Sequence, residues 1–331
     1  MKSSRWSFSR LGIYQGFVFI VLLLLSGCRG PLNLSDIPQP ILPFKPVTNR
    51  VFLVVFENQK YGAIIGNARA PYLNSLAQRY AVAANFFANT HPSIGDYFML
   101  TTGQIISNDL VFEGIITQDN IVRQLGQASM DWKAYLQSIP QPGYTGDRAY
   151  PYAKPHVPFA YFADIIQFPS QAQKMVSTDG FLSDVALDNL PAYVYITADQ
   201  KHNMHDCTSG VPKTCTNDDK IADGDAWLQQ TLDPIIQSPG FQVHNTLIIV
   251  TWDESFDKDS EHGGGHIPVL LISPDAKPAF VSQTFYQHEA VLRLIEQRLG
   301  LPATLGAAAT APSMQEFFQP ATAATAASRP K

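Results

Sequence analysis

The stretch Asn89–Gln104 places hydroxyl, imidazole and carboxyl side chains within a few residues of one another. It reads NTHPSIGDYFMLTTGQ, so Pro92 and Gly95 flank Ser93 and an apolar run follows. Proline and glycine beside hydroxyl residues are typical of a tight turn that presents an oxygen before a helix packed by its apolar face. An ordinary helix cap made by Ser or Asp is the alternative interpretation.

Acidic residues follow two strongly apolar segments elsewhere in the chain. Glu57-Asn58 comes directly after Val51–Phe56, and Asp253-Glu254 comes directly after Thr246–Trp252. Two adjacent acids at the end of a buried strand repel each other and lose their hydration, and a bound cation removes both problems. Oxygen donors of this kind suit hard or borderline divalent ions. A solvated strand end is the other interpretation.

Histidines gather in two further segments. Asp199–Asp206 reads DQKHNMHD and brings His205 and Asp206 together, while His266 follows three glycines at 263–265. Histidine shifts the choice of ion toward Zn, Mn or Fe. Glycines let the backbone approach another group closely, and a phosphate or the metal centre is a candidate for that group. A surface loop and a flexible linker are the alternatives.

The elements that must position these residues alternate between strands and helices. Apolar runs predict strands over 51–56, 81–87, 192–197, 246–252 and 268–273, with a further strand near 129–135. Periodic apolar residues predict helices over 71–80, 120–127, 223–236 and 288–299, the last ended by Gly300. This alternation predicts an α/β fold, a three-layer α/β/α sandwich around a mostly parallel sheet. The site of such a sheet lies beyond the carboxyl ends of its strands, where the polar clusters fall.

The first 27 residues predict an export signal. Met1–Arg10 carries three basic residues and no acid, Phe17–Leu25 is apolar throughout, and Leu25-Ser26-Gly27-Cys28 follows. This ending resembles the lipobox of bacterial lipoproteins, which implies cleavage before Cys28, a lipid on that residue and attachment to the cell envelope. Arg29 at the next position favours the outer membrane. A plain cleaved signal and an uncleaved anchor are the alternatives.

Composition divides the rest of the chain into a Pro-rich tether (28–49), a folded domain (50–302) and an Ala/Thr/Pro-rich tail (303–331) whose end is expected to be disordered. Loss of the three basic residues of the signal leaves 20 Lys and Arg against 28 Asp and Glu, a net charge of −8. That balance excludes the charge pattern of a nucleic-acid binder. With Cys28 lipidated, Cys207 and Cys215 lie eight apart in a polar loop of an exported protein, which predicts a local disulfide.

Seven segments of the chain, in order, resemble one known family. They read VVFENQKYGAIIG, APYLNSLA, THPSIGDYFMLTTGQ, NMHD, GDAWL, TLIIVTWDES and GGGHIPVLLIS, between about residues 51 and 299. Together they resemble the bacterial phosphoesterase family of the alkaline-phosphatase superfamily, which includes acid phosphatases and phospholipase C enzymes. The resemblance implies an alkaline-phosphatase-like fold and hydrolysis of phosphoric esters through a metal-bound hydroxyl nucleophile and a covalent phospho-enzyme.

The resemblance also implies roles for individual residues. Ser93 matches the nucleophile, and one or two divalent ions (Zn, Mn, Mg, Ca or Fe) are implied. The implied metal ligands are Glu57, Asn58, Ser93, Asp253 and Glu254. The residues implied around the phosphate and the substrate are His156, His205, Asp206 and His266.

Two positions depart from the family pattern. Asp96 stands where many relatives have Asn, and Asn203 stands where Asp is more frequent. Asp96 is expected beside the phosphate, either protonated or turned onto a metal, because a carboxylate there repels a phosphate dianion. These departures keep open an alternative, a catalytically weak or inactive surface lipoprotein that uses the fold for binding. Hydrolysis of phosphoric esters is the leading hypothesis, with monoesterase and diesterase not separated.

Overall fold

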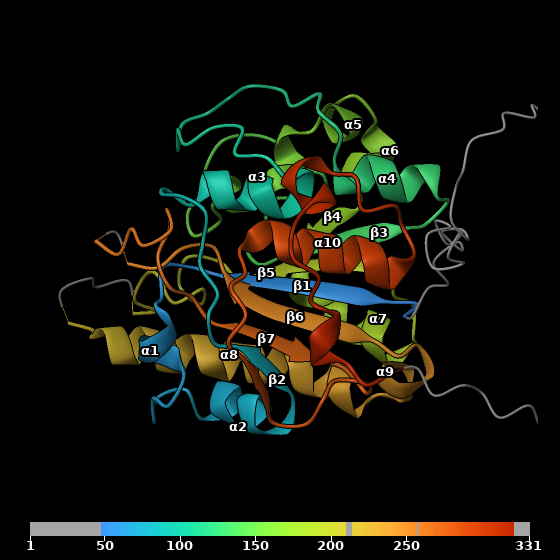
Figure 1. Ribbon diagram of the computed structural model, residues 1–331. Coiled ribbons are helices and arrows are strands. Elements are labelled where there is room, and N and C mark those ends of the chain that lie inside the picture. The colour runs from blue at the N-terminus through green and yellow to red at the C-terminus, as the bar shows by residue number, and fades with distance from the viewer. Residues whose placement is uncertain (1–47, 210–213, 257, 321–331) are drawn as a thin grey trace, which may run out of the picture. The chain divides into compact units, whose positions relative to one another are not determined.

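The computed structural model describes residues 48–209, 214–256 and 258–320, which contain a sheet of eight strands (Figure 1). The strands are β1 (Val51–Phe56), β2 (Ala81–Ala83), β3 (Trp132–Leu136), β4 (Met175–Ser177), β5 (Tyr193–Thr197), β6 (Leu247–Trp252), β7 (Val269–Ile272) and β8 (Phe280–Ser282). Their order across the sheet is β4-β3-β5-β1-β6-β7-β2-β8. The two strands that acidic residues follow, β1 and β6, are therefore neighbours.

The sheet is parallel except at β7. β1 pairs in parallel with β5 and with β6, so that Val55 lies between Thr197 and Thr251, whereas β7 is antiparallel to β6 and to β2. Every residue of β1 and β6 is buried, as expected for apolar strands covered on both faces. The prediction of an α/β fold around a mostly parallel sheet is confirmed.

Helices cover both faces of the sheet. In Figure 1, α3 (Ile94–Thr102), α4 (Ile121–Gln127) and α10 (His288–Leu299) lie on one side of it, and α2 (Pro71–Arg79), α8 (Asn217–Gln237) and α9 (Pro239–Val243) lie on the other. The shorter helices are α1 (Tyr61–Ile64), α5 (Ala163–Ile166), α6 (Pro169–Ala172) and α7 (Phe181–Ala186). The predicted helices are present, but α8 begins at Asn217 rather than Asp223, because Thr216 and Asp219 form a capping box there.

The packed body extends past residue 302, where the tail was expected to begin. Leu305, Met314 and Phe317 are buried, and the short 3-10 helix Gly306–Ala309 packs on α10. The predicted signal, Cys28 and the end of the tail lie outside the described residues. Among the described residues, no helix has both the length and the apolar character that crossing a bilayer requires.

An ion pair between a buried arginine and a half-buried aspartate holds the end of α10. Arg298 has no exposed side-chain surface, and its Nη1 and Nη2 donate to the two carboxylate oxygens of Asp275 at 2.8 and 2.9 Å. Burial alone raises the pKa of Asp275, but hydrogen bonds from Arg298 and Ser273 outweigh that effect and hold the pKa below its usual value. Asp275 therefore stabilises the fold in its charged form.

We expect Asp275→Asn to lower the free energy of unfolding by about 2–4 kcal/mol, because it leaves a buried guanidinium without its counter-ion. Since the folded-state pKa is lowered, wild-type stability from this pair is present above the usual pKa of Asp and is lost as the pH falls through the folded-state value. Urea unfolding of both proteins near neutral pH and in acid measures the two effects. Asp119→Asn, which breaks an exposed pair with Arg123, is the control and should cost less than about 1 kcal/mol. Equal losses would contradict the assignment.

Candidate active site

Ser93 stands directly before α3, in the turn that the sequence pattern indicates. It is the N-cap residue of the helix, and the preceding His91-Pro92 peptide bond is cis. Its Oγ makes no capping hydrogen bond; it donates to Glu57 Oε1 at 2.7 Å and lies 3.1 Å from Glu254 Oε1. The side chain is buried and faces the carboxyl ends of β1 and β6, which excludes the interpretation of Ser93 as an ordinary helix cap.

Three buried acids from two adjacent strands meet at Ser93. Glu57 follows β1, Asp253 and Glu254 follow β6, and at most 3% of each is exposed. One oxygen of each residue lies within 4.8 Å of the others, which is the spacing of ligands around one metal ion. Asp253 Oδ1 accepts hydrogen bonds from the backbone N–H groups of Asn58 and Glu254, at 3.1 and 2.7 Å, and these bonds fix the carboxylate.

Hydrogen bonds leave some oxygens of this acidic group without a partner. Asp253 Oδ2 and Asn58 Oδ1 are buried and accept no hydrogen bond from the described part of the chain. Burial raises the pKa of Glu57 to about 7. Burial, with the charges of Glu57 and Glu254, raises the pKa of Asp253 well above its usual value. Close acids with unpartnered oxygens fit a divalent cation, which would relieve both the repulsion and the loss of hydration.

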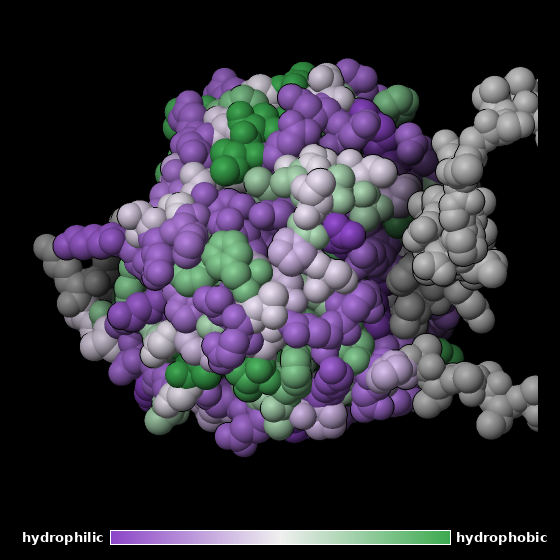
Figure 2. All heavy atoms as spheres, in the orientation of Figure 1, coloured by the Kyte–Doolittle hydropathy of each residue, from purple (hydrophilic) through white to green (hydrophobic). Residues whose placement is uncertain are grey.

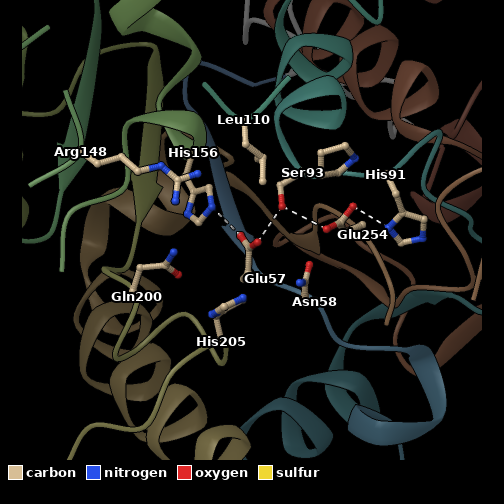
Figure 3. A pocket seen from close by; sticks show the side chains of 11 residues that line it. Glu57, Asn58, His91, Ser93, Leu110, Arg148, His156, Gln200, His205 and Glu254 are labelled. Atoms are coloured by element: carbon tan, nitrogen blue, oxygen red, sulfur yellow. Dashed lines mark hydrogen bonds and ion pairs between the residues drawn. The ribbon is translucent and has the colours of Figure 1, made fainter. Parts of the chain in front are cut away.

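A cavity of about 530 Å³ opens over the contact between Ser93, Glu57 and Glu254 (Figure 3). Its lining consists of Glu57, Asn58, His91, Pro92, Ser93, Leu110, Arg148, His156, Gln200, His205 and Glu254. In Figure 3 the carboxyl of Glu57 and the hydroxyl of Ser93 point into the same space as the ring of His205 and the amide of Asn58. The structure therefore brings together most of the predicted metal and catalytic residues.

His156 lines this cavity from a 3-10 turn, Lys154–His156, as the resemblance implied. Its Nε2 lies 2.9 Å from Glu57 Oε2, and its ring stacks on Tyr97 with 5.1 Å between ring centroids. Burial lowers the pKa of His156 to about 4, and the nearby charge of Asp253 opposes that shift only in part. The imidazole is therefore neutral near pH 7 and stands beside the carboxyl that accepts from Ser93.

His91 is a site residue that sequence reasoning left without a role. Its Nδ1 lies 2.7 Å from Glu254 Oε2, and its Nε2 lies 2.9 Å from the backbone oxygen of Asp259. A carbonyl oxygen only accepts, so Nε2 carries a hydrogen and Nδ1 shares a further proton with the carboxyl group of Glu254. This contact holds one oxygen of Glu254 and leaves the other facing Ser93. The sequence did contain a signal for this role, because His91 lies two residues before Ser93.

His266 and Asp206 lie outside the cavity that contains Ser93. His266 stacks on Tyr61 with 4.7 Å between ring centroids, and its Nε2 lies 2.9 Å from the backbone oxygen of Ala84. Asp206 contacts His205 Nδ1 at 2.8 Å and lines a neighbouring cavity. Of the His and Asp residues implied around the phosphate, only His205 and His156 face Ser93.

Asp96, expected beside the phosphate, is fully buried behind the turn instead. Its Oδ1 accepts from the backbone N–H of Asn89 at 2.8 Å and lies 3.6 Å from Nε2 of the buried His288. Burial, opposed by the Asn89 hydrogen bond and reinforced by the charge of Asp253, raises its pKa well above the usual value. Burial therefore favours the protonated form of Asp96, whose Oδ1 holds the backbone leading into the turn, and Asp96 is not part of the cavity lining in front of Ser93.

The three glycines at 263–265 do bring backbone close to another group, but that group is the chain leading to Ser93 rather than a phosphate or a metal. Gly264 N donates to Ala88 O at 3.0 Å, and Gly265 O accepts from Ala88 N at 3.0 Å. A Cβ on Gly263 would overlap the carbonyl of Asn89, and one on Gly264 would overlap the carbonyl of Thr90. The glycines thus allow two backbone segments to pack directly.

We expect Gly264→Ala to lower kcat/KM by about tenfold or more, because displacing the Thr90 backbone shifts Ser93, and misplacement by about 1 Å is known to cost up to about 100-fold. Steady-state kinetics with a chromogenic test substrate measure this effect. Gly126→Ala on the exposed surface of α4 is the matched control, since a Cβ there meets nothing within 4 Å. Unchanged kinetics in Gly264→Ala would show that this packing does not position the turn.

The predicted disulfide between Cys207 and Cys215 is present, with 6.0 Å between the two Cα atoms. It closes the polar loop that directly follows His205 and Asp206. Sequence reasoning did not indicate Leu110 or Arg148, because they come from segments with no periodic apolar pattern or family motif. It gave Gln200 no role, although this residue lies in the segment Asp199–Asp206.

The fold is shared with solved proteins of one superfamily. A solved protein of the alkaline phosphatase superfamily from Vibrio parahaemolyticus superposes with a TM-score of 0.57 at 14% identity, over 84% of this chain and 73% of that one. That likeness shows the fold, an alkaline-phosphatase-type sandwich.

Sequence comparison identifies the family. The Phosphoesterase family matches residues 64–302. A phosphatidylinositol-3-phosphatase from Mycobacterium tuberculosis is 30% identical over 276 residues, which cover 82% of this chain and 84% of the relative. A probable acid phosphatase from Kluyveromyces lactis is 25% identical over 268 residues, 76% of this chain but 58% of that longer protein. The chain belongs to the Phosphoesterase family and is a phosphoric ester hydrolase.

Proposed function

We propose that this protein hydrolyses phosphoric monoesters through Ser93, at a site that binds one divalent cation. The observation that carries the proposal is the position of Ser93 Oγ, 2.7 Å from Glu57 Oε1 and 3.1 Å from Glu254 Oε1. A hydroxyl with a buried carboxylate on each side has acceptors for its proton and stands within the group of oxygens that fits a cation. The residues that would hold the cation are Glu57, Asp253 and Glu254, with the amide oxygen of Asn58 beside them.

A serine hydroxyl is a weak nucleophile at neutral pH until its proton is removed. Glu57 Oε1, the nearer acceptor, takes that proton as Ser93 Oγ forms a bond to phosphorus and the bond to the ester oxygen breaks. Water then attacks the phosphoryl group, the bond from Ser93 Oγ to phosphorus breaks, Glu57 returns its proton to Ser93, and phosphate leaves. A bound cation would supply positive charge that favours the deprotonated serine and the charged phosphoryl oxygens.

Other lining residues act on the two ends of the ester. The Arg148 guanidinium is a permanent positive charge at the edge of the cavity and can pair with phosphoryl oxygens. The N-terminus of α3, at Ser93, adds the positive end of a helix dipole. His205 is 41% exposed and can exchange a proton between solvent and the departing alcohol oxygen.

A monoester is the preferred substrate because the relatives are named for phosphatases. One is named for removal of phosphate from a phosphatidylinositol phosphate, and others are named as acid phosphatases. A phospholipase-C-like diesterase is the alternative within the same family.

We also propose that the mature protein is an exported lipoprotein of the cell envelope, attached through Cys28 by the Pro-rich tether. The support is the sequence Leu25-Ser26-Gly27-Cys28 after a basic and then apolar N-terminus. Metabolic labelling with a tagged fatty acid tests this proposal. Label should enter the wild-type protein and not Cys28→Ser, and equal labelling of both would contradict it.

The catalytic proposal is tested with p-nitrophenyl phosphate and p-nitrophenylphosphocholine, before and after removal of metal with EDTA. We expect turnover mainly of the monoester, loss of turnover with EDTA, and its return with one of Mn, Zn, Mg or Ca. No turnover of either ester with any of these ions would overturn the proposed hydrolase. Turnover that resists exhaustive chelation would overturn the part played by the cation.

A further inference from the structure

A second cavity, of about 250 Å³, adjoins the cavity that contains Ser93. Leu110 and Arg148 line both cavities, so the two lie side by side. The 3-10 turn Lys154–His156 also serves both, because Lys154 and Pro155 line the second cavity and His156 lines the first. In Figure 3, Arg148 and His156 lie to the left of Glu57, Leu110 lies above it between His156 and Ser93, and His91 and Asn58 lie to the right.

Apolar side chains make up much of the second cavity. Leu110, Val111 and Phe112, from the segment between α3 and α4, face Tyr161 from the 3-10 turn that precedes α5. Val111 is 77% and Leu110 38% exposed, so the segment presents large apolar groups to solvent. Figure 2 shows strongly hydrophobic residues gathered on the surface near α3. Exposed apolar groups beside a catalytic cavity are typical of a binding surface.

Charge in the second cavity is balanced. Two basic residues, Arg148 and Lys154, are matched by two acidic ones, Glu113 and Asp147. Lys154 Nζ lies over the ring of Tyr161, 4.8 Å from its centroid, so part of its charge is already directed at an aromatic face. The second cavity therefore does not favour another phosphate or a sulfate.

We propose that the second cavity binds the alcohol part of the substrate, and that this alcohol is apolar. The inference rests on the proposed phosphatase activity and adds its substrate class. With the phosphoryl group at Ser93, the ester oxygen can leave toward Leu110 and Arg148, and the attached carbon chain then lies against Leu110, Val111 and Tyr161. A polar alcohol such as glycerol would place hydroxyl groups against these apolar walls and lose hydration.

The test compares hexyl phosphate with glycerol 3-phosphate. Both are primary alkyl esters, so their leaving groups are alike and the comparison reports binding of the alcohol. We expect the wild-type protein to show a kcat/KM at least about tenfold higher for hexyl phosphate. In the double variant Leu110→Ser/Val111→Ser the ratio should fall to within about threefold of unity.

The matched control is Leu182→Ser/Val243→Ser. These side chains are 52% and 74% exposed and line a different cavity, together with Asp188, which pairs with Arg50 directly before β1. That cavity lies at the opposite end of the strand from Glu57. The control should keep the wild-type preference. Equal use of both esters by the wild-type protein, or loss of preference in the control as well, would overturn the proposed subsite.

Binding measurements test the proposed subsite independently of the proposed catalytic activity. Hexylphosphonate and methylphosphonate have no ester bond to break, and calorimetry gives their affinities without turnover. Tighter binding of hexylphosphonate to the wild-type protein, but not to Leu110→Ser/Val111→Ser, supports the subsite even if no ester is hydrolysed. Equal affinities of the two phosphonates for the wild-type protein would overturn the subsite while the phosphatase proposal stands.

Discussion

Ser93→Ala should reduce turnover of a phosphomonoester by at least about 1,000-fold, since loss of an attacking hydroxyl leaves only the binding and electrostatic parts of catalysis. The fold should be unaffected, because Ser93 Oγ makes no helix-capping hydrogen bond, and its hydrogen bonds within the described residues go to the carboxylates of Glu57 and Glu254. Steady-state kinetics measure the loss of turnover, and thermal unfolding of the same protein measures the stability of the fold.

Thr90→Val is the control for the loss of a hydroxyl from the same turn. Thr90 Oγ1 accepts from Asn108 Nδ2 at 2.8 Å and donates to the backbone oxygen of His91. It is not part of the cavity lining, so its loss should change kcat/KM by no more than a few-fold. If Thr90→Val were as inactive as Ser93→Ala, or if Ser93→Ala kept most of its turnover, the nucleophile would lie elsewhere.

Asp253→Asn should have opposite effects on the metal-free protein and on metal binding. Without metal, the substitution removes an acid whose charged form is opposed by burial and by the neighbouring charges of Glu57 and Glu254, and we expect Tm to rise by about 2–4 °C, roughly 1 kcal/mol for a domain of this size. The shape of the side chain is kept, and its Oδ1 can still accept from the backbone N–H groups of Asn58 and Glu254. With metal, one ligand is lost, so affinity should fall by about 100-fold or more.

Thermal unfolding with and without excess Mn or Zn measures both effects. Wild-type protein should gain about 2.7 kcal/mol at a metal concentration of about 100 times Kd, and Asp253→Asn should gain almost nothing. Asp225→Asn is a matched buried carboxyl that caps α2 through Tyr72 N and Leu73 N and lies outside the acidic group. It should lower stability but keep the gain from metal. Full metal content in Asp253→Asn would contradict the assigned site.

The strands that carry the site were predictable because their signals are local. An apolar run followed by an acid predicts a buried strand and its carboxyl end from adjacent residues alone, and so Glu57, Asp253 and Glu254 fall where the sequence placed them. The reversed direction of β7 was not predictable, because its apolar residues pair equally well either way. The burial of Leu305 and Phe317 was likewise not predictable, since small residues separate them and leave no continuous apolar pattern.

The site residues that were misplaced or missed depend on contacts distant in sequence. Asp96 lies three residues from Ser93, but the pattern did not show that its carboxyl turns toward the backbone of Asn89. His266 follows glycines that do make a close approach, yet its ring turns to Tyr61 and away from the cavity. Arg148 and Leu110 come from loops whose apolar residues follow no periodic pattern. Only the packing of those loops brings them to the site.

The central claim, that Ser93 attacks phosphorus, is tested most directly by finding the phosphoryl group on it. The protein is mixed with substrate, quenched in acid during turnover and digested, and the peptide that contains Ser93 is analysed by mass spectrometry. We predict the added mass of one phosphoryl group on Ser93, absent without substrate and absent in Ser93→Ala. A phosphoryl group on another residue, or none on any peptide while turnover proceeds at the full rate, would contradict the claim.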